Sequence, residues 1–192
     1  MRLPGLLSPD LLEAALERVR ATRFGSSEKS WVIDVEGSVE HSTDYALNFL
    51  VQDPAFFSFV SAVTGCGPVR SFSGRLIRSR GGTGHFLDWH EDCSFDHRRL
   101  ASLSLNLSPR PYRGGVLQFR RIGETRIRAQ IANTGLGDAL LFAARGGEHR
   151  NTPVEGRGVK TAFSGWFYGD RPGKDAFFTR EARKKGGGHA AR

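Results

Sequence analysis

The segment 87-LDWHEDCSF-95 places one histidine, His90, among several acidic residues. If this segment is extended, successive side chains point to opposite faces, so His90 and Asp92 share one face. Asp88 shares that face as well, whereas Glu91 points away. An imidazole and a carboxylate from one short segment can then reach the same metal ion. Two histidines and one carboxylate suit Fe(II) and leave coordination positions open for O₂ and a cosubstrate.

The predicted iron site requires a second histidine, and the sequence contains six in all. His149 is the best candidate, because it follows the apolar stretch 138-DALLF-142 and a glycine-containing turn. His97 is the competitor, because it lies close to the first motif in a predicted loop. The other three are less favourably placed: His189 in the terminal tail, His41 in a predicted helical region and His85 on the opposite strand face. The expected ligands are therefore His90, Asp92 and His149.

The composition predicts one folded domain. The chain has 192 residues, of which 39% are hydrophobic and 25% charged, and this is typical of a globular domain with a sizeable core. The formal net charge is +8, but residues 171–192 hold seven Lys/Arg and two acids and so contribute 7 − 2 = +5. A basic terminus of this kind is typical of a solvated tail. The charge therefore argues against nucleic acid as a partner.

The cysteines and the first residues bear on location. Cys66 and Cys93 form no closely spaced pair, which argues against a disulfide framework and fits a reducing cytoplasm. Asp10 and Glu13 interrupt the apolar residues near the start, so the sequence predicts neither a signal peptide nor a membrane span. We therefore expect a cytoplasmic protein without a membrane partner. The sequence does not indicate an oligomeric state.

The chain divides into a helical region, residues 1–66, and a strand-rich region, residues about 70–168. Ser8 precedes an amphipathic helix, and residues 43–64 read as one or two further helices with a restart at Asp53-Pro54. Short strands are predicted at about 70–79, 99–107, 115–121, 125–132, 138–143 and 159–168. This order predicts a mainly β domain, residues 1–178, with the N-terminal helices packed on one sheet. Residues 179–192 are predicted to be a flexible basic tail.

Two of the predicted strands have one apolar and one polar face. In 100-LASLSLNLS-108, alternation puts three leucines on one face and Ser102, Ser104 and Asn106 on the other. In 159-VKTAFSGWF-167, the corresponding mixed face carries Lys160, Ala162, Ser164 and Trp166. The polar faces either line a cavity or meet solvent, and the strand pattern alone does not distinguish the two.

Four segments in order resemble those of prolyl-4-hydroxylase-like 2-oxoglutarate/Fe(II) dioxygenases. The stretch 84-GHFLDWHED-92 resembles the G-x-F-L-x-x-H-x-D motif of that family. It is followed by 114-GGVLQF-119 and 137-GDALLF-142, which resemble two later strands of the family. The fourth, 149-HRNTPVEGRGVKTAFSGWF-167, resembles the last part of the family pattern. The resemblance covers about residues 72–168.

This resemblance implies a double-stranded β-helix, the jelly roll of the cupin-like folds, that holds Fe(II) through His90, Asp92 and His149. It also implies 2-oxoglutarate and O₂ as cosubstrates, with ascorbate as an optional reductant. The implied reaction releases succinate and CO₂ and hydroxylates an unactivated C–H bond. The carboxylate of Asp92 argues against halogenation, since halogenating relatives lack that ligand.

A basic residue of the family binds the distal carboxylate of 2-oxoglutarate six residues before the Trp of the closing W-F pair. Lys160 has this position relative to Trp166, and strand parity also favours it over Arg157. Many relatives place a Tyr on the strand after H-x-D to bind the same carboxylate. Here Asn106 occupies that place, and its amide can donate a hydrogen bond. A second Tyr, common before the Gly that precedes H-x-D, has no counterpart.

The resemblance leaves the substrate open. An amino acid, peptide or related small molecule is expected, because residues 93–99 and 108–114, with residues 20–42, are predicted to form a basic rim around the site. A nucleic-acid-demethylating relative would carry a second Arg at position 166, where this chain has Trp. Two further alternatives are a non-catalytic metal-binding cupin-like module and a zinc hydrolase. The first would be expected to lack a ligand or the basic residue, and the second gives Lys160 no role.

Overall fold

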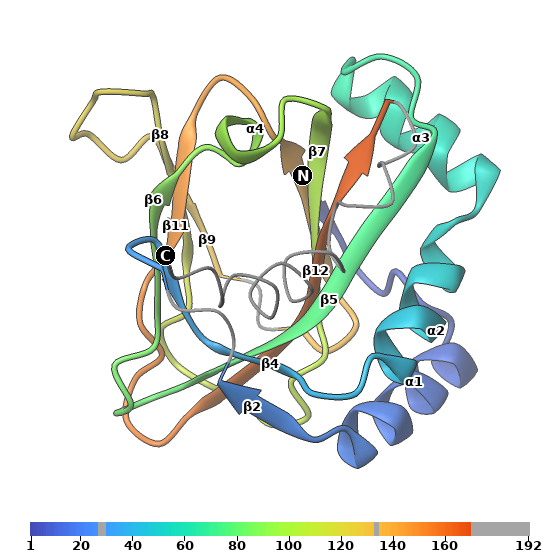
Figure 1. Ribbon diagram of the computed structural model, residues 1–192, viewed down its shortest axis with the longest axis vertical. Helices are drawn as coiled ribbons and strands as arrows, with labels where there is room; N and C mark the ends of the chain where they lie inside the picture. The colour runs from blue at the N-terminus through green and yellow to red at the C-terminus, as the bar shows by residue number, and fades with distance from the viewer. Residues whose placement is uncertain (27–29, 133–134, 170–192) are drawn as a thin grey trace, which may run out of the picture.

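The computed structural model describes residues 1–26, 30–132 and 135–169, and it consists of two antiparallel sheets and four helices (Figure 1). The predicted domain end at residue 178 and the predicted tail, residues 179–192, lie outside the described residues. Two facing sheets with helices on one side are the architecture expected from the sequence. The predicted mainly β jelly roll is therefore confirmed.

The larger sheet has seven strands in the order β1-β10-β7-β12-β5-β4-β2. In this order they are β1 (Arg2–Leu3), β10 (Ala139–Ala143), β7 (Arg99–Asn106), β12 (Val159–Tyr168), β5 (Ser71–Arg80), β4 (Glu36–Ser38) and β2 (Phe24–Ser26). The smaller sheet has five strands in the order β3-β6-β11-β8-β9. In this order they are β3 (Ile33–Asp34), β6 (Phe86–His90), β11 (Glu148–Asn151), β8 (Leu117–Arg120) and β9 (Ala129–Ile131).

Helices α1 (Pro9–Ala21), α2 (Ser42–Val51) and α3 (Pro54–Thr64) lie on one side of the barrel (Figure 1). The predicted break at Asp53-Pro54 separates α2 from α3, and the Asp53 side chain caps α3 by accepting a hydrogen bond from the Phe56 backbone N–H. Gly65 ends α3 with a φ of 63°, a left-handed conformation that glycine adopts without strain. Ser8 precedes α1 as predicted, but its side chain makes no capping hydrogen bond.

The main core lies between these helices and the larger sheet. The predicted leucine face of β7 is confirmed, since Leu103, Leu105 and Leu107 are buried in the core cluster together with residues of α1, α2 and α3. From β12, Phe163 and Phe167 join the same core. The opposite faces of both strands therefore point between the two sheets. Ser102 and Asn106 are buried there, so the polar row of β7 lines the interior rather than meeting solvent.

Helix α2 covers part of the edge of β5 with polar side chains. Residues 71–76 of β5 pair with β12 on one side only. On the other side, Asp44, Asn48 and Gln52 follow one another at intervals of four, one helical turn, and bond to backbone groups of that edge. Their partners are the backbone groups of Leu76, Gly74 and Phe72, respectively. The helix thus provides hydrogen-bond partners for backbone groups at a sheet edge that would otherwise be open to pairing with another strand.

The region 20–42 differs from the sequence expectation of a rim. It contains β2 and β4, which extend the larger sheet, and β3, which pairs with β6 at the edge of the smaller sheet. Each of these strands has two or three residues. Strands this short show too little side-chain alternation to be recognised in a sequence.

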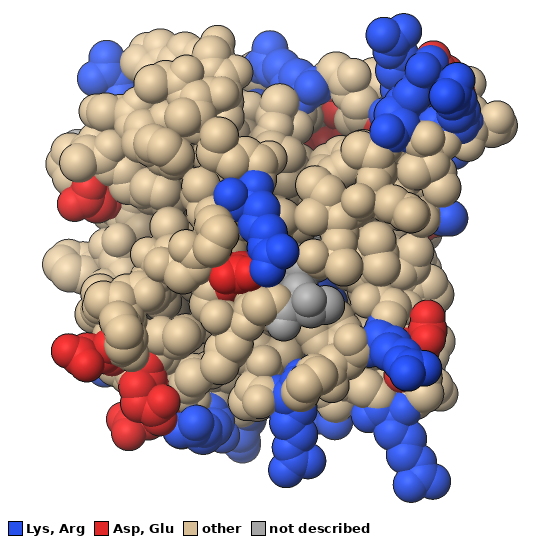
Figure 2. Space-filling model, turned by 180° about the vertical axis from the view of Figure 1, so that it is seen from behind, with Lys and Arg blue, Asp and Glu red and all other residues tan. Residues whose placement is uncertain are grey.

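The distribution of charged side chains on the surface and the length of the helices complete the description of the fold. On the face shown in Figure 2, Lys and Arg side chains lie mainly around the periphery, and uncharged residues form most of the centre. Among the described residues, no single helix is long and apolar enough to cross a membrane. Only α2 and α3 taken together, bent by 69° at their junction, reach the required length and composition.

Candidate active site

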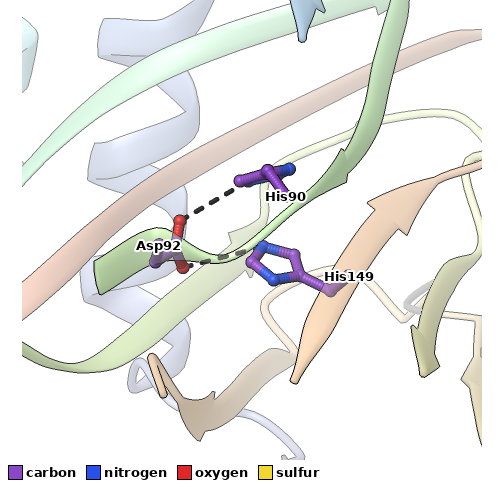
Figure 3. A group of neighbouring side chains, drawn as sticks. All are labelled: His90, Asp92 and His149. Carbon is purple, nitrogen blue, oxygen red and sulfur yellow. Dashed lines mark ion pairs between the residues drawn. The ribbon is translucent and has the colours of Figure 1, made fainter. Parts of the chain in front are cut away.

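Three predicted metal ligands come together between the sheets (Figure 3). His90 ends β6, Asp92 begins the short helix α4 (Asp92–Phe95), and His149 lies on β11. Strands β6 and β11 pair so that His149 is directly opposite His90. One ligand atom from each residue lies within 4.8 Å of the others, and all three residues are buried. Within the described part of the chain, this is the only such group of His, Cys, Asp and Glu side chains.

The Asp92 carboxylate faces both imidazoles, with one oxygen toward each (Figure 3). His90 Nε2 is 3.5 Å from Asp92 Oδ1, and His149 Nε2 is 3.6 Å from Asp92 Oδ2. The two imidazole ring centroids are 4.2 Å apart. Three potential ligand atoms therefore converge on one small volume, as a mononuclear metal site requires.

Neighbouring groups fix the orientation of these ligands. His90 Nδ1 donates a hydrogen bond to the backbone carbonyl of Asp88 at 2.7 Å, which leaves a lone pair on Nε2 for a metal ion. The Ser102 hydroxyl, on β7, donates to Asp92 Oδ2. Phe142 packs edge-on against the His149 ring at 4.9 Å between centroids. This donor set, two imidazole nitrogens and one carboxylate oxygen, fits Fe(II).

The electrostatics of the cluster favour its metal-binding protonation states. Burial alone would raise the pKa of Asp92. Its interactions with the His90 and His149 side chains and the hydrogen bond from Ser102 outweigh it and lower that pKa well below its usual range. Burial lowers the pKa of His149 to about 4, against the opposing attraction of Asp92. At neutral pH the aspartate is therefore ionised and His149 neutral, the forms that bind metals.

Asp88 does not share the face of His90, contrary to the expectation from simple alternation. It is exposed, and its carboxylate accepts a hydrogen bond from the Trp89 backbone N–H. The cause is an irregularity in β6, where His90 pairs with His149 but Leu87 pairs with Asn151. From one of these pairs to the other, the chain advances three residues along β6 but only two along β11. Strand β6 therefore contains one extra residue, a β-bulge, and this breaks the regular alternation of its side chains.

The competing histidines lie elsewhere. His97 is exposed and lies outside the metal cluster, whereas His149 lies within it. His85 is near the larger sheet, where its Nδ1 accepts a hydrogen bond from the Arg80 backbone N–H at 3.1 Å. His41 bonds to Asp44 at the start of α2.

Lys160 points into a cavity between the sheets. Its ammonium group donates to the Gly115 carbonyl at 2.9 Å and to Asn151 Oδ1 at 2.8 Å. Burial lowers the pKa of Lys160 to about 8. The fit is close at Gly115, which has a φ of 59° and where an added Cβ would lie 3.0 Å from Lys160 Cδ. Arg157, the competing cation, is exposed in the preceding turn.

Asn106 is buried but is engaged elsewhere. Its amide nitrogen donates to the Gly135 carbonyl at 3.0 Å, and its amide oxygen accepts from the Ser108 backbone N–H at 3.0 Å. The cavity that contains Lys160 is lined instead by polar residues that the sequence did not single out for this role: Ser79, His85, Asn151 and Thr152. Of these, the sequence could have suggested only Asn151, because it lies two residues after His149 and so shares its strand face.

The predicted basic rim is wrong in one respect. The two predicted rim segments contact different ends of β12. Ser108, at the start of 108–114, accepts a hydrogen bond from the Thr161 backbone N–H near the start of β12, whereas Arg99, at the end of 93–99, pairs with Tyr168 at the end of β12. These positions on β12 are 168 − 161 = 7 residues apart, or roughly 23 Å in an extended strand. Residues 93–99 and 108–114 therefore lie at opposite ends of the barrel and cannot form one opening.

The metal cluster lies toward the end of the barrel that holds Arg99. The Arg99 guanidinium stacks over the Trp166 ring at 3.6 Å and donates from Nη1 to the Asp92 carbonyl at 3.1 Å. Arg98 forms a bidentate ion pair with Asp96 instead. Arg99 therefore bonds directly to a residue of the metal cluster, whereas Arg98 bonds to Asp96.

Comparisons with known proteins show which enzymes the chain resembles. Residues 75–168 match the family model of the 2OG-Fe(II) oxygenase superfamily. Among curated proteins, no sequence match was found. The predicted resemblance to this superfamily is therefore confirmed over residues 75–168. The enzymes of this superfamily are dioxygenases that use Fe(II), 2-oxoglutarate and O₂.

Solved structures share the fold. A prolyl-4-hydroxylase from Pseudomonas putida has a TM-score of 0.65 and 17% identity, over 88% of this chain and 91% of the other. A prolyl hydroxylase from Trichoplax adhaerens, in complex with a hypoxia-inducible factor peptide fragment, has a TM-score of 0.62 and 16% identity, over 88% and 82%. SnoN, an epimerase of nogalamycin biosynthesis, has a TM-score of 0.62 and 15% identity, over 88% and 77%.

Proposed function

We propose that His90, Asp92 and His149 bind Fe(II), and that the enzyme hydroxylates an unactivated C–H bond of an amino acid, peptide or related small molecule. The observation that carries the metal assignment is the convergence of three oriented ligand atoms within 4.8 Å in a buried site. When bound, Fe(II) with 2-oxoglutarate supplies the activation of O₂ that yields succinate, CO₂ and an oxidised substrate.

Lys160 is proposed to bind the distal carboxylate of 2-oxoglutarate. An ammonium group has three N–H donors, and two of these are used by Gly115 and Asn151. The third is left for the carboxylate, and the two fixed bonds hold the amine in position. Asn151 lies two residues after His149 on β11, so both side chains point between the sheets. The cavity is thus about 7 Å along the strand from the metal ligand.

The remaining residues around the metal cluster have proposed roles in binding and orientation. Arg99 and Trp166 form a cationic and aromatic wall beside Asp92, which suits an amino-acid or peptide substrate with carbonyl or carboxylate groups. The Trichoplax relative was solved with a peptide fragment. The epimerase relative uses the same fold, so the fold alone does not set the outcome of the oxidation.

The proposal is tested by anaerobic Fe(II) binding and by aerobic turnover of the reconstituted enzyme. His149→Ala should abolish both Fe(II) binding and succinate release while the thermal melting temperature changes little, because one of three ligands is lost and the main core is intact. His97→Ala is the matched control and should behave as wild type. Full activity of His149→Ala together with inactivity of His97→Ala would show that the third ligand is wrongly assigned.

A further inference from the structure

The cavity around Lys160 is lined by both polar and apolar side chains. Besides Asn151, the polar residues that line it are Ser79, His85 and Thr152. The apolar side chains that line it are Val35, Ile77, Phe86, Leu87, Val154 and Ala162. A small, buried volume with these two kinds of lining suits an aliphatic chain that ends in a carboxylate.

The ring proton of His85 is placed by a backbone contact. Its Nδ1 accepts a hydrogen bond from the Arg80 N–H, so in the neutral imidazole the proton is on Nε2. Nε2 is therefore a donor, and the residue lines the cavity. A carboxylate is the acceptor that matches such a donor.

Thr152 and Ser79 provide hydroxyl groups to the lining of the same cavity. The Thr152 oxygen accepts from the Val116 backbone N–H at 3.0 Å, which leaves its own O–H to donate. Ser79 is the direct cross-strand partner of Lys160, and side chains at paired positions lie on one face about 5 Å apart. Both hydroxyls can therefore approach a carboxylate that is bound to the Lys160 ammonium.

We propose that His85, Ser79 and Thr152 join Lys160 in binding the distal carboxylate of 2-oxoglutarate, in place of the Tyr residues of related enzymes. This inference rests on the proposed function. It replaces the expectation for Asn106, whose amide bonds to the backbone of Gly135 and Ser108. One N–H of Lys160 satisfies one carboxylate oxygen, and the three neutral donors satisfy the remaining lone pairs.

The test compares two 2-oxo acids that differ at the distal end. 2-Oxoglutarate and 2-oxobutanoate are titrated into the Fe(II)-loaded full-length protein under nitrogen, and binding is followed by the charge-transfer absorption rather than by turnover. His85→Asn and Thr152→Val should each weaken 2-oxoglutarate binding about 10-fold or more, since each removes a hydrogen bond to a charged group. The affinity for 2-oxobutanoate, which lacks the distal carboxylate, should stay within about twofold of wild type.

The choice of His85→Asn and two control variants make the result decisive. Asn can still accept from the Arg80 N–H but is too short to replace Nε2, so His85→Asn removes the donor and keeps the turn. Thr152→Ser retains the hydroxyl and should retain affinity, and His97→Asn changes a histidine that is exposed and outside the cavity. Equal loss of affinity for both 2-oxo acids, or no loss for either, overturns this inference alone. A wild-type protein without a charge-transfer band overturns the proposed function and this inference together.

Discussion

At the scale of single residues, Asp92 is the centre of the candidate metal site. Its carboxylate lies beside both imidazoles and accepts the Ser102 hydroxyl. The H-x-D spacing predicted the neighbours His90 and Asp92. Ser102 could not be assigned from the sequence, because its contact with Asp92 depends on how β7 packs against α4. The sequence showed that Ser102 lies on a polar strand face, but not which residue this face contacts.

Replacing Ser102 tests the support that it gives to Asp92. Ser102→Ala should lower Fe(II) affinity about 10-fold or more, because losing a group that holds a metal ligand in place typically costs that much. Ser104→Ala is the matched control, since this hydroxyl on the same face of β7 bonds to Ser164 and lies outside the metal cluster. Anaerobic titration with Fe(II) measures both. An equal change in the two variants would count against a specific role for Ser102.

The pH dependence of cosubstrate binding should report Lys160. Burial lowers the pKa of this amine to about 8, so in the free enzyme the ammonium is lost as the pH rises through about 8. The KM for 2-oxoglutarate should therefore be lowest below pH 8 and rise above it, while kcat at saturation changes little. Lys160→Ala should raise KM about 30-fold or more at neutral pH and abolish this pH dependence. Arg157→Ala should keep the wild-type profile, and loss of the profile in that variant would contradict the assignment.

At the scale of elements, the helices and strands with a clear periodic pattern of apolar residues could be predicted from the sequence. The long strands β5, β7 and β12 follow their predicted ranges closely, and the break between α2 and α3 falls at Asp53-Pro54 as predicted. The extra residue in β6 was not predictable, because it depends on how β6 pairs with β11. The orientation of Asp88 was wrong for that reason. The support that α2 gives to β5 depends likewise on a tertiary contact.

The contact between α2 and β5 gives a stability prediction. Asn48 bonds to both the N–H and the carbonyl of Gly74, at 2.7 Å each. Asn48→Ala should lower the free energy of unfolding by about 1–3 kcal/mol, because backbone groups at a covered sheet edge lose their partners. Phe49→Ala, on the same helix, should change it by less than about 0.5 kcal/mol, since Phe49 is 80% exposed. Urea denaturation measures both, and similar losses in the two variants would contradict the proposed role of Asn48.

At the scale of the whole molecule, the two ends of the barrel have different chemistry. The Lys160 cavity lies toward the start of β12, and the metal cluster lies closer to its end, where Arg99 pairs with Tyr168. The sequence analysis predicted one basic rim around the site, because the sequence does not show that residues 108–114 lie at the opposite end of the barrel from residues 93–99. A substrate that approaches the metal cluster from the Arg99 end meets Arg99 and Trp166 instead of the arginines of residues 108–114.

This arrangement leads to a prediction about the substrate class. We expect an amino-acid or peptide-derived compound to raise succinate release above the uncoupled rate and to gain one oxygen atom, whereas methylated oligonucleotides should do neither. The reason is the Arg99 and Trp166 wall beside Asp92, with Trp at the position where demethylases would carry a second Arg. Coupled succinate assays with mass spectrometry of peptide and oligonucleotide pools measure both outcomes. Deleting residues 183–192, which lie outside the described residues, should leave the rate nearly unchanged. Efficient oligonucleotide demethylation, or loss of activity on that deletion, would instead assign the basic charge of the chain a direct part in substrate binding.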